Sequence, residues 1–241
     1  LTTWSDRTTQ AVAGTGAFSN MENPGNYVEA LKQSQDPNSP TVAQFGPRVL
    51  SWSLLLNFSE TVGVEDDIDA ELRQFFRNKD FRVALSHALD REAIGQSIAR
   101  GPFSYPFPGG FSVGSPFYDY DSTVYYGFDQ ELANSMLDEL GLTDTDGNGI
   151  RNLPGTGADM EIDLTYDNGE PTDKKQVDAV VSMLGEVGIS ILSRPVDELA
   201  NIADSGNFNM IERRNHWVIP TFRTCDFVPI SENCPDQHPV A

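Results

Sequence analysis

Apolar residues recur at helical spacing between residues 78 and 101, and polar residues mark where each predicted helix begins. Asp80 is placed to cap a first helix, Asp90 to cap a second, and Gly101 follows the last turn. The apolar stripe of the first helix consists of Phe81, Ala84, Leu85, Ala88 and Leu89. The pattern predicts two short helices joined at an Asp-Arg turn.

A strand–helix–strand pattern follows between residues 160 and 192. Apolar and polar residues alternate from Met160 to Tyr166, which is the period of a strand with one buried face. Valines and Leu184 then recur at helical spacing up to Gly188, and residues 189–192 form a second apolar strand. A helix between two strands favours a parallel pair joined by a right-handed crossover.

The rest of the chain is less periodic. Residues 1–48 are polar, with a short helix expected at 27–33, and residues 102–127 are a loop rich in proline and aromatic residues. Further predictions are a buried strand at 52–58, an acidic loop at 59–69, a helix from Asp129 to Gly141, a helix at 197–204 and a strand near 208–211. Together these elements predict an α/β fold, a mixed sheet flanked by helices.

The charge balance excludes one class of partner. The 241 residues include 36 acidic and 16 basic side chains, a formal net charge of −20, which would repel a nucleic acid backbone. A solvated acidic surface is the simplest interpretation; cation loading and adaptation to salt stay open. The chain opens on a polar segment rather than a basic-then-apolar leader, so we expect a mature product or a fragment.

The two cysteines, Cys225 and Cys234, are close enough in sequence for a disulfide to close a short polar loop. A disulfide closing so short a loop would stabilise the fold by roughly 2–3 kcal/mol. It would also indicate an oxidising compartment outside the cytoplasm. Two free thiols are the alternative.

One loop resembles the first half of an EF-hand. Asp144, Asp146 and Asn148 supply oxygens at positions 1, 3 and 5, Gly149 occupies position 6, and Ile150 could supply a carbonyl at position 7. Gly155 replaces the bidentate glutamate of position 12, which removes two ligands. The loop therefore predicts either a structural calcium site or an Asx-turn in which the aspartates accept backbone N–H groups.

Ser112 lies in a G-x-S-x-G pattern, but the pattern lacks the context of a nucleophile elbow. An elbow needs a strand directly before the serine and a helix directly after it. Here Phe-Pro-Gly precedes the pattern and Ser-Pro-Phe follows it. A chance match is the simpler interpretation.

Residues 78–94 resemble the N-K-D-x-R-x-A-L-x-x-A-x-D-R-x-A-I signature of the family 5 extracellular solute-binding proteins, the receptors of bacterial ABC importers. Other segments resemble the same family in the same order. They are the G-P…L-x-x-N strand at 46–57, the Y-D-x-x-x-A-x-x-L-L-D-E-A-G helix at 126–142, the D-x-D-G-D-G-x-R loop at 144–151, the G-I at 188–189 and the F-D-x…W segment at 208–217.

The resemblance implies a candidate solute site near residues 211–223. Arg213 and Arg214, next to His216, could form bidentate bonds to a carboxylate or phosphate, or could be solvated or paired with acidic residues at the surface. Trp217 could stack on a sugar face or an apolar side chain, or could pack in the core. Phe103 and Tyr105 of the proline-rich loop are candidates for lining the cleft. Peptide binders of the family carry an aspartate three residues after the tryptophan; Pro220 stands there, which argues against a peptide ligand.

The resemblance also implies the architecture. Residues 46–241 would form lobe II of a type II periplasmic-binding-protein fold, with residues 1–45 as a polar arm packed on it. Family members are longer, so we expect this chain to be a second-lobe fragment whose partner is the first lobe of the same protein.

The implied function is capture of a small solute, an oligopeptide, oligosaccharide or similar molecule, between two lobes that close and deliver it to an ABC permease. No enzymatic reaction and no cofactor beyond the structural calcium are expected. The location would be extracytoplasmic, in the periplasm or at the cell surface, either free or lipid-anchored in the full-length protein. Two alternatives stay open: an extracytoplasmic serine hydrolase using Ser112, and a calcium-stabilised interaction module.

Overall fold

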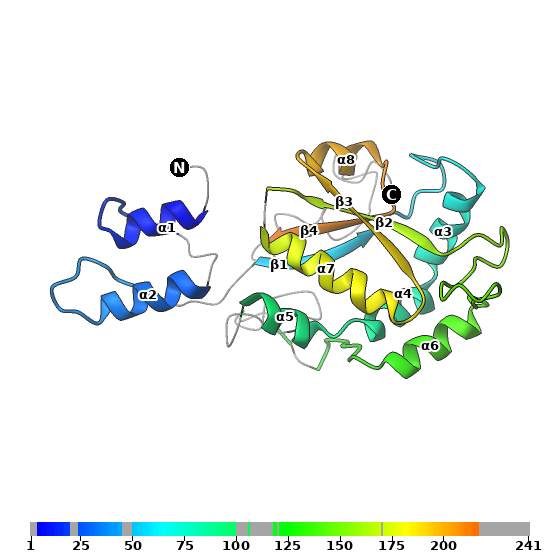
Figure 1. The fold of residues 1–241 in the computed structure, drawn as a ribbon, viewed down its shortest axis with the longest axis horizontal. Coiled ribbons are helices and arrows are strands. Elements are labelled where there is room, and N and C mark those ends of the chain that lie inside the picture. The colour runs from blue at the N-terminus through cyan, green and yellow to red at the C-terminus, as the bar shows by residue number, and fades with distance from the viewer. Residues whose placement is uncertain are drawn as a thin grey trace. The chain divides into compact units, whose positions relative to one another are not determined.

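The computed structural model describes residues 4–19, 24–44, 50–99, 106, 118–119, 121–169 and 171–216 (Figure 1). The chain divides into two compact units. One comprises Leu1–Arg48 with Gly95–Pro106, and the other comprises Val49–Ile94 with Phe107–Ala241. The predicted boundary at residue 45, between an arm and a lobe, stays a prediction.

Two helices in the first unit, α1 (Trp4–Val12) and α2 (Pro24–Ser34), pack against each other. Helix α2 confirms the short helix expected at 27–33, whereas the loop or extended arm expected around α1 was wrong. Thr8 of α1 is buried, and its Oγ1 lies 3.2 Å from Ser19 Oγ. Such tertiary contacts can hold a helix whose sequence carries little periodicity of its own.

The second unit contains a mixed sheet. In the described part of the chain its strands run in the order β1-β4-β2-β3, with bounds of Leu50–Leu56 for β1, Glu161–Asp167 for β2, Ser190–Val196 for β3 and Met210–His216 for β4. Strand β2 pairs in parallel with β3 and with β4, and β1 pairs antiparallel with β4. Helix α7 (Pro171–Gly185) connects β2 to β3, so the predicted strand–helix–strand unit is confirmed.

One face of this sheet supports the core. Ile162, Leu164 and Tyr166 of β2 are buried, and α7 lies along β2 and β3 (Figure 1). Helices α3 (Asp67–Arg77), α4 (Lys79–Ala88) and α6 (Gln130–Glu139) add their apolar faces to the same cluster. Helix α5 (Arg91–Ala99) follows α4, and α8 (Leu199–Ser205) lies against β2.

Strand β1 differs from the buried strand expected at 52–58. It begins two residues earlier and lies at one end of the strand order, next to β4 alone. Leu54 and Leu56 pack against the core, but Leu55 between them points to the other face and is 38% exposed. The continuous apolar run therefore indicated two buried faces where the strand has one.

Helix α3 was not expected: its first residues fall in the predicted acidic loop at 59–69, and no element was predicted at 70–77. Its first turn is acidic, and the Asp66 carboxylate caps it by accepting the backbone N–H of Asp69. Leu72 and Phe76 are buried one turn apart. Acidic residues in a first turn suit the helix dipole, and here they concealed a helix start.

The caps of the next helices are settled by the structure. Asn78 ends α3 and caps α4 by accepting the N–H of Asp80 at 2.8 Å, so the expected cap at Asp80 was wrong. Asp90 accepts the N–H of Ala93 and caps α5 as predicted. Asp129 likewise caps α6, accepting the N–H of Leu132.

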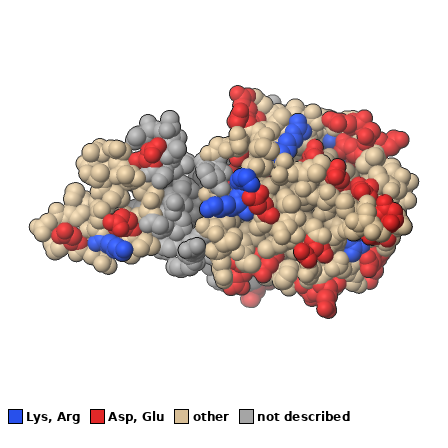
Figure 2. Space-filling model, in the orientation of Figure 1, with Lys and Arg blue, Asp and Glu red and all other residues tan. Residues whose placement is uncertain are grey.

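Acidic side chains are the more frequent charged groups on the face of the molecule that Figure 2 shows. None of the described helices is long and apolar enough to cross a membrane.

Among the described glycines, Gly63 lies closest to the backbone of another segment. It has φ of +68°, and a Cβ at this position would lie 2.2 Å from the carbonyl oxygen of Gly206. Gly206 is itself left-handed, with φ of 71°, where it ends α8. The loop after β1 and the turn before β4 thus meet backbone to backbone.

We expect Gly63→Ala to lower the free energy of unfolding more than Gly147→Ala does. Gly147 also has positive φ, but no atom lies within 4 Å of the place its added methyl group would take, so it measures the conformational cost alone, about 1–2 kcal/mol. The clash at Gly63 should add about 1–3 kcal/mol. Urea unfolding of both variants checks this, and equal losses would contradict the backbone contact.

Candidate functional site

The carboxyl ends of parallel strands form the edge where open α/β sheets bind ligands. Strand β2 ends at Asp167 and β3 at Val196. Ile211 of β4 pairs with Thr165, so Arg213, two residues further on, lies level with the end of β2. We term this region the carboxyl edge; it consists of Trp52, Asp167, Asn168, Asp173, Asp197 and Arg213.

The first turn of α7 is fixed at the carboxyl edge by a tryptophan. The indole Nε1–H of Trp52 on β1 donates to Asp173 Oδ1 at 3.0 Å. Asp173 is 2% exposed, so its carboxylate is held inside the first turn of the helix rather than presented to solvent. The contact joins an edge strand to the crossover helix across 121 residues of sequence.

The turn between β2 and α7 forms the exposed part of the carboxyl edge. The backbone N–H of Asn168 donates to the carbonyl of Val196, and its side-chain Nδ2 donates to Asp197 Oδ1 at 3.3 Å. The N–H of Gly169 donates to Asp167 Oδ1 at 2.8 Å. The ends of β2 and β3 are therefore tied together and present polar side chains to solvent.

The structure describes only some of the residues that were predicted to bind a solute. Arg213 is exposed and lies opposite Ser53, while Arg214 lies opposite Trp52 and His216 opposite Leu50. Trp217, Phe103, Tyr105, Ser112, Cys225 and Cys234 lie outside the described residues, and their roles stay predictions.

Trp52, Asp173 and Asn168 were not among the predicted site residues. A usable signal was present: polar residues directly after the strand at 161–167 belong to the edge where ligands bind in parallel sheets. The partnership of Trp52 with Asp173 could not be found in the same way, because it depends on the register of β1 against β4.

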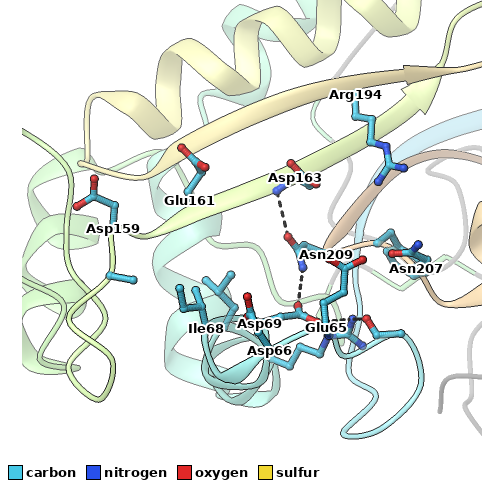
Figure 3. A pocket seen from close by; sticks show the side chains of 15 residues that line it. Glu65, Asp66, Ile68, Asp69, Asp159, Glu161, Asp163, Arg194, Asn207 and Asn209 are labelled. Atoms are coloured by element: carbon cyan, nitrogen blue, oxygen red, sulfur yellow. Dashed lines mark hydrogen bonds and ion pairs between the residues drawn. The ribbon is translucent and has the colours of Figure 1, made fainter.

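A hollow of about 420 Å³ lies at the opposite, amino end of β2 and β4 (Figure 3). Arg194 points toward it from β3, while Glu161 and Asp163 extend from β2 (Figure 3). Its polar lining is mostly acidic and includes Glu65, Asp66, Asp69, Asp159, Glu161, Asp163, Arg194, Asn207 and Asn209.

Several of these groups already serve the fold. Asp66 caps α3, and Asp159 accepts bonds from the side-chain amides of Asn148 and Asn152. Asn209 donates to Asp69 Oδ1 at 2.7 Å and accepts the backbone N–H of Asp163 at 3.2 Å (Figure 3). We therefore take the carboxyl edge, not this hollow, as the candidate functional site.

A buried arginine of helix α3 binds the loop that follows β1, near the amino end of β2 and β4. Arg73 is 1% exposed and forms a two-pronged ion pair with Asp69, at 3.1 Å from Nε and 3.0 Å from Nη2. Its remaining N–H groups donate to the carbonyls of Val62 at 2.8 Å, Gly63 at 2.7 Å and Ser59 at 3.4 Å. All donors of the guanidinium are thus satisfied, which a buried charge requires.

Two arginines of the signature at residues 78–94 donate hydrogen bonds to backbone carbonyls of this chain. Arg82 donates to the carbonyls of Phe76 and Arg77 at the end of α3. Arg91 donates to the carbonyls of Ser86 and Tyr126, and burial lowers the pKa of its guanidinium.

His87 contacts the loop that precedes α6. Its Nδ1 lies 2.6 Å from the carbonyl oxygen of Gly127, and its ring meets Tyr126 edge-on. The histidine therefore holds this loop by a short polar contact and a ring contact.

The calcium-like loop forms Asx-turns. Asp144 accepts the N–H groups of Gly147 at 2.7 Å and Gly149 at 2.9 Å. Asp146 accepts the N–H of Asn148, whose own side-chain oxygen accepts that of Ile150. Carboxylate oxygens can accept further bonds, so calcium at Asp144, Asp146, Asn148 and Ile150 stays a prediction.

The chain is similar in sequence and in fold to known proteins. The sequence pattern of the bacterial extracellular solute-binding proteins, family 5 Middle, matches residues 3–234. A periplasmic alpha-galactoside-binding protein of Rhizobium meliloti (strain 1021) is 37% identical over 247 residues, covering 99% of this chain and 34% of that protein. The oligopeptide-binding protein AppA of Bacillus subtilis (strain 168) is 26% identical over 164 residues, covering 63% of this chain and 28% of that protein.

A solved structure is also similar. The periplasmic binding protein MelB from Agrobacterium fabrum C58, in complex with stachyose, matches with a TM-score of 0.81 and 43% identity over 89% of this chain and 33% of that one. The chain thus spans about a third of the length of these relatives. The predicted α/β lobe of a type II periplasmic binding protein is confirmed.

We expect Arg73→Met to lower the free energy of unfolding by about 3–5 kcal/mol, because it leaves the buried Asp69 carboxylate without its counter-charge. Arg77→Met on the same helix is the control. Arg77 pairs with Glu60, which is 73% exposed, so its loss should cost only about 0–1 kcal/mol. Urea unfolding measures both, and similar losses would refute the role given to Arg73.

Stability on the acid side should depend on Asp144. The N–H groups of Gly149 and Gly147 lower its pKa below the ordinary value of 3.8. A lowered pKa means that this carboxylate stabilises the fold above 3.8 and that the contribution is lost as the pH falls through the lowered value.

Asp144→Asn should therefore lower the melting temperature at neutral pH and reduce the further loss on acidification. Asp36→Asn is the matched control, since Asp36 is exposed and its carboxylate accepts bonds from Asn38 alone among the contacts described. Melting curves across the acid range decide the matter; parallel curves for wild type and Asp144→Asn would contradict the assignment.

Proposed function

The chain belongs to the family 5 bacterial extracellular solute-binding proteins, and on that premise we propose that it is part of the receptor of an ABC importer that captures an oligosaccharide of the α-galactoside class. The observation that carries the solute class is the similarity over nearly the whole chain to a protein named for binding α-galactosides. The stachyose complex of the similar solved structure supports the same class. The peptide-binding relative is less similar and matches a shorter part of the chain.

The carboxyl edge supports solute binding on physical grounds. A neutral oligosaccharide presents hydroxyl groups and apolar ring faces, so it needs directional polar groups and aromatic surface rather than a counter-charge. Asp167, Asn168 and Arg213 supply donors and acceptors there, and Trp217 directly follows β4 in the sequence. This chain would supply one wall of the cleft, and the first lobe of the same protein the other.

Binding without reaction is part of the proposal. The receptor would enclose the sugar between lobes, close about a hinge and release the sugar to a membrane permease. The receptor would work outside the cytoplasm, in the periplasm or at the cell surface. The hydrolase alternative at Ser112 is tested separately, because labelling of Ser112 by a fluorophosphonate probe would support it.

Titration calorimetry of the intact receptor tests the solute class. Stachyose should bind with measurable heat and an oligopeptide of similar mass should not; the reverse result would overturn the proposal. Arg213→Ala should weaken stachyose binding by about tenfold or more, as expected for a lost charged hydrogen bond. Arg194→Ala is the matched control, because Arg194 lines the hollow at the amino end and should leave the affinity unchanged.

A further inference from the structure

The sequence contains two Asn-Gly pairs, Asn148-Gly149 and Asn168-Gly169. Both asparagines are exposed. In both pairs the glycine N–H donates to an aspartate carboxylate, Gly149 to Asp144 at 2.9 Å and Gly169 to Asp167 at 2.8 Å. The two sites therefore resemble each other in exposure and in having a proton acceptor on the glycine nitrogen.

Asn-Gly pairs are prone to a reaction that needs no enzyme. The glycine nitrogen loses its proton and attacks the asparagine Cγ, ammonia leaves, and a succinimide ring forms. Water then opens the ring to give aspartate or isoaspartate. Glycine favours the attack because it has no side chain to obstruct the approach, and asparagine is accordingly a thermolabile residue.

The side chain of Asn148 is held at both ends. Its Oδ1 accepts the N–H of Ile150 at 2.7 Å, and its Nδ2 donates to both oxygens of Asp159 at 3.1 and 3.0 Å. Gly149 also has φ of +90°, a conformation fixed by the turn around Asp144. Rotation of the Asn148 amide toward the Gly149 nitrogen must break these contacts first.

The side chain of Asn168 is held by one longer contact. Its Nδ2 donates to Asp197 Oδ1 at 3.3 Å, beyond the usual 2.9–3.0 Å of an N–H···O bond. Gly169 lacks the positive φ of Gly149, and the nearest atom to a Cβ built there is the flexible Asp167 Oδ1 at 3.2 Å. The turn after β2 therefore leaves the amide carbon of Asn168 free to approach the Gly169 nitrogen.

We propose that Asn168 is a site of spontaneous deamidation, with the Asp167 carboxylate accepting the proton of the Gly169 N–H, and that the fold protects Asn148 from the same reaction. The product places a carboxylate where Asn168 donated to Asp197. Two carboxylates at that distance repel each other, and an isoaspartate also lengthens the main chain. Deamidation would thus loosen the tie between the ends of β2 and β3 at the carboxyl edge.

Peptide mapping by mass spectrometry of the folded chain, aged at mildly alkaline pH, tests the proposal. Each deamidation replaces an NH₂ group with OH and adds about one dalton. Conversion at Asn168 should be faster than at Asn148 by about tenfold or more, the factor expected when several hydrogen bonds must break before attack. Equal conversion, or faster conversion at Asn148, would overturn the proposal.

Two controls separate the fold from the local sequence. In guanidinium chloride the two asparagines should convert at similar rates, and selectivity that persists in the unfolded chain would refute the protective role of the fold. Asp167→Asn keeps an acceptor for the Gly169 N–H but removes the base, so conversion at Asn168 should slow by about tenfold or more. An unchanged rate would refute the role of Asp167.

A third variant measures the consequence. Asn168→Asp imitates the simple product and should lower the melting temperature through repulsion from Asp197, whereas Asn168→Asp combined with Asp197→Asn should restore it. Failure of the double variant to recover would overturn the proposed effect on the carboxyl edge. None of these readouts depends on the identity of the solute.

Discussion

The parallel pairing of β2 with both of its neighbours is the constraint on which the rest of the lobe depends. Parallel strands cannot be joined by a tight turn, so the chain must cross a face of the sheet between β2 and β3, and α7 does so over the apolar face. This crossover puts the end of β2 and the start of α7 at the same edge. Asp167, Asn168 and Asp173 lie there because they belong to the segment that joins β2 to the first turn of α7, and the parallel pairing brings Asp197, which follows β3, to the same edge.

The same pairing leaves the amino end of the sheet to be closed by other means. Strand β1 ends beside the start of β4. In the loop that follows β1, several backbone carbonyls accept their hydrogen bonds from a side chain instead of from a neighbouring strand. Arg73 binds three of these carbonyls, and Gly63 and Gly206 let the two loops touch. The acidic hollow at this end is lined in part by carboxylates that serve the fold, since Asp69 pairs with Arg73 and Asp66 caps α3.

Arginines have a common role across the lobe, and it bears on the net charge of −20. Arg73, Arg82, Arg91 and Arg151 each donate to main-chain carbonyls at helix ends or loops. Arg151 also bonds to Asp138 and to Asn134 Oδ1, which joins α6 to the loop before β2. A chain with few cations thus uses several of them on its own backbone. An acidic surface of this kind repels anions.

The sequence predicted what depends on periodicity and missed what depends on contacts between distant segments. The alternation from Met160 to Tyr166 and the valines that follow indicated β2, α7 and β3, and the structure confirms them. Helix α1 and the cap at Asn78 were missed, since tertiary packing holds α1 and a single asparagine serves two helices. The link between Trp52 and Asp173 spans 121 residues, and no local pattern marks it.

The family resemblance worked for a related physical reason. The signature residues Asn78, Arg82 and Arg91, and Arg151 of the glycine-rich loop, all bind the chain's own backbone, so matching them identifies a scaffold. Under the proposed function, solute choice would instead depend on side chains at the carboxyl edge, of which the motifs include only those near the end of β4. Relatives named for binding α-galactosides and for binding oligopeptides can share such a scaffold, because none of these contacts involves a residue of the carboxyl edge.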